Sequence, residues 1–180
     1  MIELSVIRDL VAIFGVIAGF SYYVLTVRNQ KRARQAQLLI QLYNRMQDRT
    51  LMEAYNEVMT REWSSIEDYN SKYLGREEIV NFVMVMNWFE SFGSLLKKGF
   101  LDADLVYEVV PTNATTFWEK YEPVVKWVRE TGNYPHMFRP IEYLSDEMKK
   151  IASARGEANI DFDIVYDTEH ALNKIKETST

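Results

Sequence analysis

Residues 10–27 read LVAIFGVIAGFSYYVLTV, a run of 18 residues without a charge. A helix of this length covers about 27 Å, close to the roughly 30 Å hydrocarbon core of a bilayer. Apolar residues occur on every side of it, so it has no polar face with which to lie on a membrane surface. Tyr22 and Tyr23 lie near one end, where aromatic rings favour the interface. The run predicts a single N-terminal transmembrane helix, with residues 1–28 as the anchor.

A secretory signal peptide and a buried core helix are the alternatives. A signal peptide has a basic start and a small-residue cleavage site, whereas here Arg8 is balanced by Glu3 and Asp9. The best pair of small residues, Gly19 and Ser21, falls inside the apolar run. A buried helix as apolar as this one is unusual in so small a protein, so the spanning helix is the favoured interpretation.

The basic residues on either side of the run predict its orientation. One precedes it, and four follow it closely: Arg28, Lys31, Arg32 and Arg34. By the positive-inside rule, the N-terminus then lies outside a cell membrane and residues 28–180 lie in the cytosol. We also expect these four side chains to contact anionic lipid, each contributing on the order of 1 kcal/mol.

Small residues on one side of the predicted span favour helix packing. Gly15 and Gly19 form a GxxxG pattern, and Ala12 lies on nearly the same face. Small side chains at this spacing let two helix backbones approach closely, although glycine is also frequent in membrane helices generally.

The remainder of the chain predicts an all-α fold, with a cytosolic helical domain over residues 29–155. Its apolar residues recur at helical spacing, and no run favours a sheet. Helices are expected over residues 29–47, 51–61, 76–98, 112–130 and 140–154, with short ones after Ser64 or Ser65 and after Asp102. Thr50 and Glu53 suggest a capping box, and Pro123 should kink or split its helix.

Two helices in this domain have a predicted inward face. Leu39, Leu42, Tyr43 and Met46 form the first apolar stripe. The helix over 76–98 is expected to be central, with the inward residues Ile79, Phe82, Val83, Met86, Phe89 and Phe92.

Residues 156–180 are predicted to form a mobile acidic tail. Ile160, Phe162 and Ile164 alternate with Asp161 and Asp163, a period of two that favours an extended segment. With few apolar anchors, this tail is free to dock on the helical domain or on a partner.

Charge and composition exclude several classes of function. Residues 1–34 carry a net charge of +3 and the remaining 146 carry −8, so nucleic-acid binding is not expected. The chain has no cysteine, no phosphate-binding glycine loop and no nucleophile elbow. His136 and His170 lack the paired glutamates of di-iron bundles. We therefore predict no metal, no cofactor and no assigned catalytic residue.

Glu90 is the one speculative polar site. It lies in the apolar sequence Trp88-Phe89-Glu90, with Asn87 and Ser94 near its own face. A carboxylate in an apolar setting can have a raised pKa and act as an acid or base. The alternative is that Asn87, Glu90 and Ser94 mark the solvent edge of their helix.

Several segments occur together in a recognisable order. After the apolar run come TVRNQKRARQAQLLIQLYNRMQD, TLMEAYNEVM, VMNWFESFGSLLKKGFLDADLVYEVV, FWEKYEPVVKWVRE, NYPHMFRPIEYL and DEMKK. Across residues 5–152 this order resembles a family of uncharacterised prokaryotic proteins, frequent in archaea and known as a domain of unknown function. The resemblance implies a helical cytosolic domain on a membrane anchor, and it transfers no activity, cofactor or catalytic residue.

These observations leave the function unknown and favour a membrane-tethered interaction module, either a scaffold or an accessory subunit of a membrane assembly. Its expected partners are membrane lipid and either another protein or a second copy of the chain. The alternatives are a membrane-proximal enzyme that uses a carboxylate such as Glu90, and a sensor whose basic juxtamembrane stretch responds to lipid.

Overall fold

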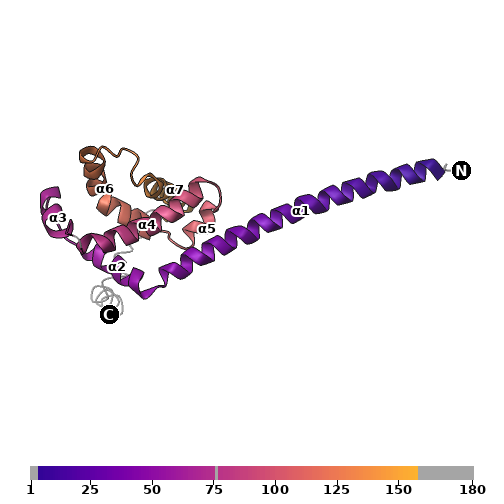
Figure 1. Ribbon diagram of the computed structural model, residues 1–180. Coiled ribbons are helices and arrows are strands. Elements are labelled where there is room, and N and C mark those ends of the chain that lie inside the picture. The colour runs from indigo at the N-terminus through magenta and orange to yellow at the C-terminus, as the bar shows by residue number, and fades with distance from the viewer. Residues whose placement is uncertain (1–3, 76, 158–180) are drawn as a thin grey trace, which may run out of the picture. The chain divides into compact units, whose positions relative to one another are not determined.

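The computed structural model describes residues 4–75 and 77–157, and this part of the chain is helical with no strand. The expected all-α fold class is confirmed. The helices, labelled in Figure 1, are α1 (Leu4–Met46), α2 (Arg49–Thr60), α3 (Ile66–Tyr73), α4 (Glu78–Lys97), α5 (Ala103–Tyr107), α6 (Asn113–Thr131) and α7 (Arg139–Arg155).

The chain divides into two compact units between Ile40 and Gln41. The first unit contains α1 up to Ile40, and the end of α1, from Gln41 to Met46, belongs to the second unit. Helix α1 continues without a break from the apolar run into the basic stretch that follows it. Its 43 residues correspond to a helix about 65 Å long. The second unit, from Gln41 to Glu157 among the described residues, is called the head below.

Two of the described helices, α1 and α4, are long and apolar enough to cross a membrane. None of the apolar stretch of α1 is buried in the protein, whereas α4 is the core helix of the head. The long apolar N-terminal helix is therefore the candidate membrane span.

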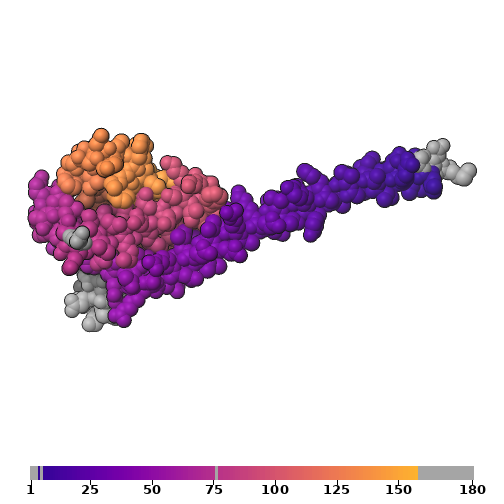
Figure 2. Space-filling view, viewed as in Figure 1, coloured from indigo at the N-terminus to yellow at the C-terminus, as the bar shows by residue number. Residues whose placement is uncertain are grey.

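Helix α4 lies at the centre of the head and packs against α7 and α2, while α6 packs against α7. The space-filling view shows the head helices packed closely together (Figure 2). The buried residues of α4 are Phe82, Val85, Met86, Trp88, Phe89, Phe92, Gly93 and Leu96. The expectation that Val83 faces inward is wrong, since it is 39% exposed.

Tyr43 is a second wrong expectation for the core. It is 42% exposed, while the carbonyl of Leu42 accepts a hydrogen bond from Trp88 Nε1 at 3.3 Å. Successive residues of a helix are about 100° apart around its axis, so the side chain that follows Leu42 already points away from the head. The inward stripe at the end of α1 is therefore narrower than predicted.

Aromatic rings join three helices inside the head. The ring centroid of Tyr121 lies 4.9 Å from those of Phe82 and Phe117, and Phe117 lies 5.0 Å from Phe89. The Tyr121 hydroxyl donates a hydrogen bond of 2.6 Å to the carbonyl of Val58. Helices α2, α4 and α6 are thus held together by one cluster with a satisfied polar group at its edge.

Side-chain caps define the starts of the shorter helices. Asp48, rather than the predicted Thr50, caps α2, because its Oδ1 accepts from the Thr50 N–H at 2.9 Å. Ser65 caps α3 through Asp68 N–H, and Asp102 caps α5 as predicted. Gly99 follows α4 with a φ of 70°, the left-handed conformation that glycine adopts readily.

Helix α6 runs through Pro123 without dividing. Of the two predicted effects of Pro123, a kink or a split, the split is wrong, because buried residues on both sides of the proline, Tyr121 and Val124 among them, hold the two halves in the core. Pro123 itself is exposed, so water can satisfy the backbone carbonyl that the proline leaves unpaired.

A hydrogen bond and two ion pairs connect the end of α7 to α5 and the residue that follows it. The Tyr107 hydroxyl donates to Glu157 at 2.7 Å, and Arg155 forms ion pairs with Asp104 at 3.1 Å and Glu108 at 2.7 Å. The rest of the predicted tail, residues 158–180, lies outside the described residues.

Candidate functional site

The candidate site begins at Arg61, the residue that ends α2. Its Nε and Nη2 atoms donate to the two carboxylate oxygens of Glu57 at 2.8 and 2.9 Å. Nη2 also donates to the carbonyl of Glu78, the first residue of α4, and the guanidinium lies 4.7 Å from the Tyr73 ring centroid. The Arg61 side chain is only 2% exposed, so it joins α2 to the start of α4 as a buried ionic link.

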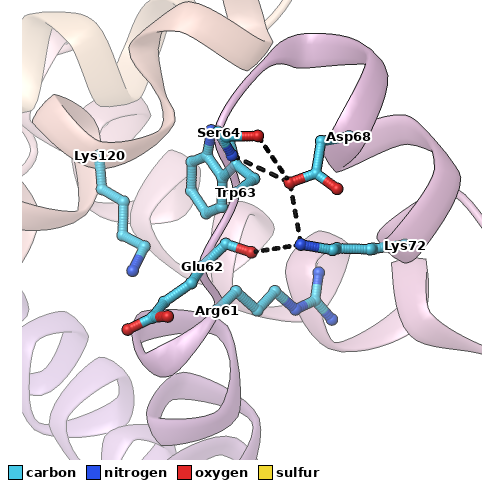
Figure 3. Close-up of a pocket in the computed structure, with 7 residues that line it drawn as sticks. All are labelled: Arg61, Glu62, Trp63, Ser64, Asp68, Lys72 and Lys120. Carbon is cyan, nitrogen blue, oxygen red and sulfur yellow. Dashed lines mark hydrogen bonds and ion pairs between the residues drawn. The ribbon is translucent and has the colours of Figure 1, made fainter.

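An open pocket of about 590 Å³ lies beside this link. Figure 3 shows its lining residues, which are Arg61, Glu62, Trp63, Ser64, Asp68, Lys72 and Lys120. All but one come from the segment that ends α2 and forms α3, and Lys120 reaches the pocket from α6. This set of residues is called the charged pocket.

Asp68 organises one side of the charged pocket. Its Oδ2 accepts from Lys72 Nζ at 2.9 Å, from the Ser64 N–H at 3.0 Å and from the Ser64 hydroxyl at 3.2 Å. The hydrogen bond from Lys72, followed by the one from the Ser64 backbone, holds the pKa of Asp68 below its ordinary value. Asp68 is therefore ionised at neutral pH and acts as an acceptor rather than a proton donor.

Lys120 forms the opposite side of the charged pocket. Its Nζ donates to the carbonyl of Met59 at 2.5 Å and lies 5.2 Å from the centroid of the Trp63 ring. The ammonium group is thus held between the end of α2 and an aromatic face, an arrangement that stabilises a cation.

The lining carries three cations against two carboxylates, although the chain as a whole is acidic. Each cation is already paired with a carboxylate or a backbone carbonyl. The Arg61 guanidinium has in addition one buried donor, Nη1, that has no hydrogen-bond partner among the described residues. The arrangement is therefore suited to recognition of an acidic group on another molecule.

A second, apolar hollow lies between α2 and α4. It is lined by Met46, Leu51, Met52, Tyr55, Asn56, Val85, Trp88 and Asn113. Its enclosed volume is about 60 Å³, far below the roughly 300–1,000 Å³ of small-molecule sites. The hollow can accept a single apolar side chain.

Glu90, which the sequence analysis named as a speculative polar site, forms a hydrogen bond to a neighbouring helix. Its Oε1 accepts a hydrogen bond of 2.8 Å from the backbone N–H of Ile141, in the first turn of α7. The first N–H groups of a helix lack partners within it, so the carboxylate of Glu90 caps α7 from the neighbouring helix. Burial raises the pKa of Glu90, against the opposing effects of the Ile141 hydrogen bond and the charge of Arg129.

The other two residues of that predicted site face different surroundings. Asn87 is exposed, and its carbonyl accepts from the Ser91 hydroxyl at 2.8 Å. Ser94 is half-buried, and its carbonyl accepts from the Lys98 N–H at the end of α4. No side-chain hydrogen bond links Asn87 or Ser94 to the Glu90 carboxylate among the described residues.

The membrane and lipid residues of the sequence prediction all lie on α1. Ala12, Gly15 and Gly19 fall in its apolar half, and a Cβ atom added at either glycine would meet nothing within 4 Å. Arg28, Lys31, Arg32 and Arg34 follow on the same helix, and all four are exposed.

Sequence reasoning missed the charged pocket. Arg61 follows Glu57 by four residues, a spacing that signals an ion pair on a helix surface but gives no sign of burial. Lys120 meets Met59 from 61 residues away, a contact that no local pattern contains.

The described residues hold no group of three or more His, Asp or Glu side chains placed to bind a metal. The fold and these sites define an all-helical head that continues from a long apolar N-terminal helix. The chain belongs to the family described as Domain of unknown function (DUF4760), which matches residues 7–148. No curated protein and no solved structure matches it.

Proposed function

We propose that this protein is a membrane-tethered interaction module, serving as a scaffold or an accessory subunit of a membrane assembly. The observation that carries the proposal is the unbroken helix α1, which joins an uncharged, fully exposed apolar run to the helical head. A surface so apolar is unstable in water and stable in a bilayer.

In this proposal α1 crosses the cell membrane with the N-terminus outside and the head in the cytosol. Arg28, Lys31 and Arg32 are exposed immediately after the apolar run, where they can contact anionic headgroups. The single cation before the run, Arg8, is paired with Asp9 at 3.1 Å, so the charge asymmetry favours this direction.

The head is the binding part in this proposal. It offers a partner two surfaces of different chemistry, the charged pocket and the apolar hollow. An acidic side chain of a partner fits the first, and one apolar side chain fits the second. A partner segment that carries both groups would gain specificity from the charged contact and affinity from the apolar one.

A lipid-responsive sensor is the second candidate, favoured by the continuity of α1 through the basic stretch into the head. Replacing Arg28, Lys31, Arg32 and Arg34 by glutamine would then change hydrogen exchange in the head in the presence of anionic vesicles. The enzyme alternative based on Glu90 has no support, because that carboxylate caps α7.

Anchoring and orientation are tested with single-cysteine variants, since the natural chain has no cysteine. We expect Leu4→Cys to react with a membrane-impermeant maleimide in intact cells and Glu130→Cys, on α6, to react only after lysis. The reverse labelling would contradict the orientation. Release of the protein from membranes by alkaline extraction would contradict the anchor.

The interaction role is tested by purifying the full-length protein in mild detergent and identifying co-eluting proteins by mass spectrometry. We expect a stoichiometric partner or a homo-oligomer. The variant Lys120→Glu should reduce recovery of a partner that uses the charged pocket, while Lys149→Glu, on the exposed side of α7, should not. A monomer with nothing bound in several detergents would contradict the proposal.

A further inference from the structure

We propose that the charged pocket binds a phosphate group, carried either by a small phosphorylated compound or by a lipid headgroup. The donors are the side chains of Arg61, Lys72 and Lys120, together with the hydroxyl of Ser64. The proposal rests on the proposed function for the binding role of this pocket, but it requires neither the membrane anchor nor a protein partner.

An unused donor of Arg61 points most directly to a bound anion. Its Nε and Nη2 atoms donate to Glu57 and to the Glu78 carbonyl, whereas Nη1 is buried and has no hydrogen-bond partner among the described residues. A buried donor without an acceptor is unfavourable, and an acceptor from outside the chain removes that cost. One hydrogen bond of this buried guanidinium is therefore left for a ligand to make.

The positive charge of Arg61 is also incompletely neutralised. The Arg61 side chain is 2% exposed while that of Glu57 is 44% exposed, so water screens the carboxylate more than the guanidinium. A cation in the wall of the pocket attracts an anion through surroundings of low dielectric. Direct contact with Nη1 requires the wall to open, and the exposed lining side chains of Glu62 and Lys72 can move at little cost.

Lys72 and Ser64 supply donors on the Asp68 side of the pocket. Lys72 Nζ donates to Asp68 at 2.9 Å, but its second hydrogen bond, to the Glu62 carbonyl, is 3.4 Å long. Since an ammonium has three N–H donors, Lys72 can keep Asp68 and turn another donor to a ligand oxygen. The Ser64 hydroxyl lies 3.2 Å from Asp68 and can exchange that bond for a phosphate oxygen.

Lys120 faces these donors from the opposite side of the pocket, as Figure 3 shows. Its Nζ lies 2.5 Å from the Met59 carbonyl and 5.2 Å from the centroid of the Trp63 ring. These contacts hold the ammonium in place before any ligand arrives. A donor that is already positioned loses little conformational freedom when an anion binds.

The arrangement of the donors favours a phosphate over a carboxylate. A carboxylate has two oxygens in one plane, whereas a phosphate monoester has three acceptor oxygens and carries up to two negative charges. Arg61 ends α2, Lys72 belongs to α3 and Lys120 to α6, so the cations come from separate elements. The volume of about 590 Å³ lies within the roughly 300–1,000 Å³ of small-molecule sites and accommodates the organic part of the ligand.

The carboxylate of Glu62 allows the sign of the ligand's charge to be tested. Glu62 is exposed, and Figure 3 shows its carboxylate on the Lys120 side of the pocket. This negative charge repels an anion and attracts a cation. Glu62→Gln should therefore strengthen the binding of a phosphate, whereas it would weaken the binding of a positively charged ligand.

The test is isothermal titration calorimetry of the full-length protein in an uncharged detergent at constant low ionic strength. The probes are glycerol 3-phosphate and dioctanoyl phosphatidic acid, with acetate and dioctanoyl phosphatidylcholine as controls. We expect at least one phosphate probe to bind with a Kd of about 1 mM or tighter, and acetate to bind more weakly. Binding of glycerol 3-phosphate would identify a soluble ligand, and binding of phosphatidic acid alone would identify a lipid headgroup.

Variants of single lysines locate the binding in the pocket. Lys120→Gln and Lys72→Gln should each weaken the binding of the phosphate probe about three- to fivefold, as expected for the loss of one partly exposed charge. Lys126→Gln is the matched control, because Lys126 also lies on α6, is 61% exposed and pairs with Glu122. Arg61 is left intact, since its replacement weakens the fold, and circular dichroism confirms that each variant is folded.

Three results would overturn the proposal: no binding of either phosphate probe, acetate binding as tight as phosphate binding, or equal binding by the wild type and both pocket lysine variants. Weaker phosphate binding after Glu62→Gln would overturn it as well. None of these measurements depends on membrane insertion or on co-purification. A failure here is thus distinguishable from a failure of the proposed interaction role, which the recovery of a partner tests separately.

Discussion

Gly93 of α4 lies directly against Pro140 of α7, so closely that a Cβ atom at Gly93 would collide with the Pro140 carbonyl oxygen. One turn earlier on α4, Glu90 accepts a hydrogen bond from Ile141, the residue after that proline. Glu90 and Gly93 therefore act at the same place: one satisfies the start of α7, and the other provides the space in which that start can lie.

Replacing Gly93 by alanine should destabilise the head. The obstacle to the new methyl group is backbone of α7, which cannot move aside as a flexible side chain can. Overpacking of this kind costs about 1–3 kcal/mol, despite the higher helix propensity of alanine. The measurement is chemical denaturation followed by circular dichroism. Ser91→Ala, on the exposed side of the same helix, should change stability by less than about 0.5 kcal/mol.

Glu90 should make stability depend on pH. Burial raises its pKa above the ordinary 4.5, against the opposing effects of Ile141 and Arg129. A carboxyl group with a raised folded-state pKa stabilises the fold fully below pH 4.5, and this contribution is lost as the pH rises through the folded-state value. We therefore expect the denaturation midpoint of the wild type to fall, relative to that of Glu90→Gln, as the pH rises from 4.5 through the folded-state pKa of Glu90.

Two substitutions at Glu90 distinguish the stability that comes from its hydrogen bond to α7 from the effect of its negative charge. The amide oxygen of Glu90→Gln can still accept from the Ile141 N–H, so at neutral pH this variant should be at least as stable as the wild type. Glu90→Ala removes the acceptor and should cost about 0.5–2 kcal/mol, as loss of a helix cap does. Equal destabilisation by both substitutions would show that the hydrogen bond is not what Glu90 contributes.

The helices of the head were largely predictable because their apolar residues recur at helical spacing and polar caps precede several of them. Asp102 and Ser65 are caps that act within their own turn, so the sequence predicted Asp102 directly and Ser65 as one of two candidates with Ser64. Glu90 was recognisable as unusual, but its partner lies 51 residues further along the chain. Only the packing of α4 on α7 turns that carboxylate into a cap.

The width of a buried face is harder to predict than its existence. Val83 and Tyr43 lie one residue beyond buried or head-facing positions, and the sequence placed both in the core. Whether such a flanking residue is covered depends on where the neighbouring helix ends. The same limit applies to Arg61, whose burial depends on Glu78 and Tyr73 rather than on its own helix.

Arg61 should be far less tolerant of replacement than a comparable surface arginine. Arg61→Lys loses the paired hydrogen bonds to Glu57 and the contact with the Glu78 carbonyl, which a single ammonium cannot reproduce. Because Glu57 is partly exposed, we expect a loss of about 1–3 kcal/mol rather than the full cost of breaking a buried pair. Arg49→Lys is the matched control, since Arg49 pairs with Glu53 on the same helix and is 91% exposed. Similar denaturation curves for the two variants would contradict the buried link.

Tyr121→Phe should destabilise the head although it keeps the aromatic ring in place. The hydroxyl donates to the carbonyl of Val58 at 2.6 Å inside the core, and its removal leaves that carbonyl with the longer, 3.3 Å hydrogen bond from the Arg61 N–H. The net loss of one such hydrogen bond costs about 0.5–1.5 kcal/mol. Tyr73→Phe is the control, because the Tyr73 hydroxyl reaches the Glu62 carbonyl at 3.2 Å in an exposed setting where water can replace it. Thermal unfolding of the two variants should therefore show a clear fall in midpoint for Tyr121→Phe and little change for Tyr73→Phe. A small effect at Tyr121 would mean that the Arg61 N–H is a sufficient partner for the Val58 carbonyl and that the hydroxyl adds little to stability.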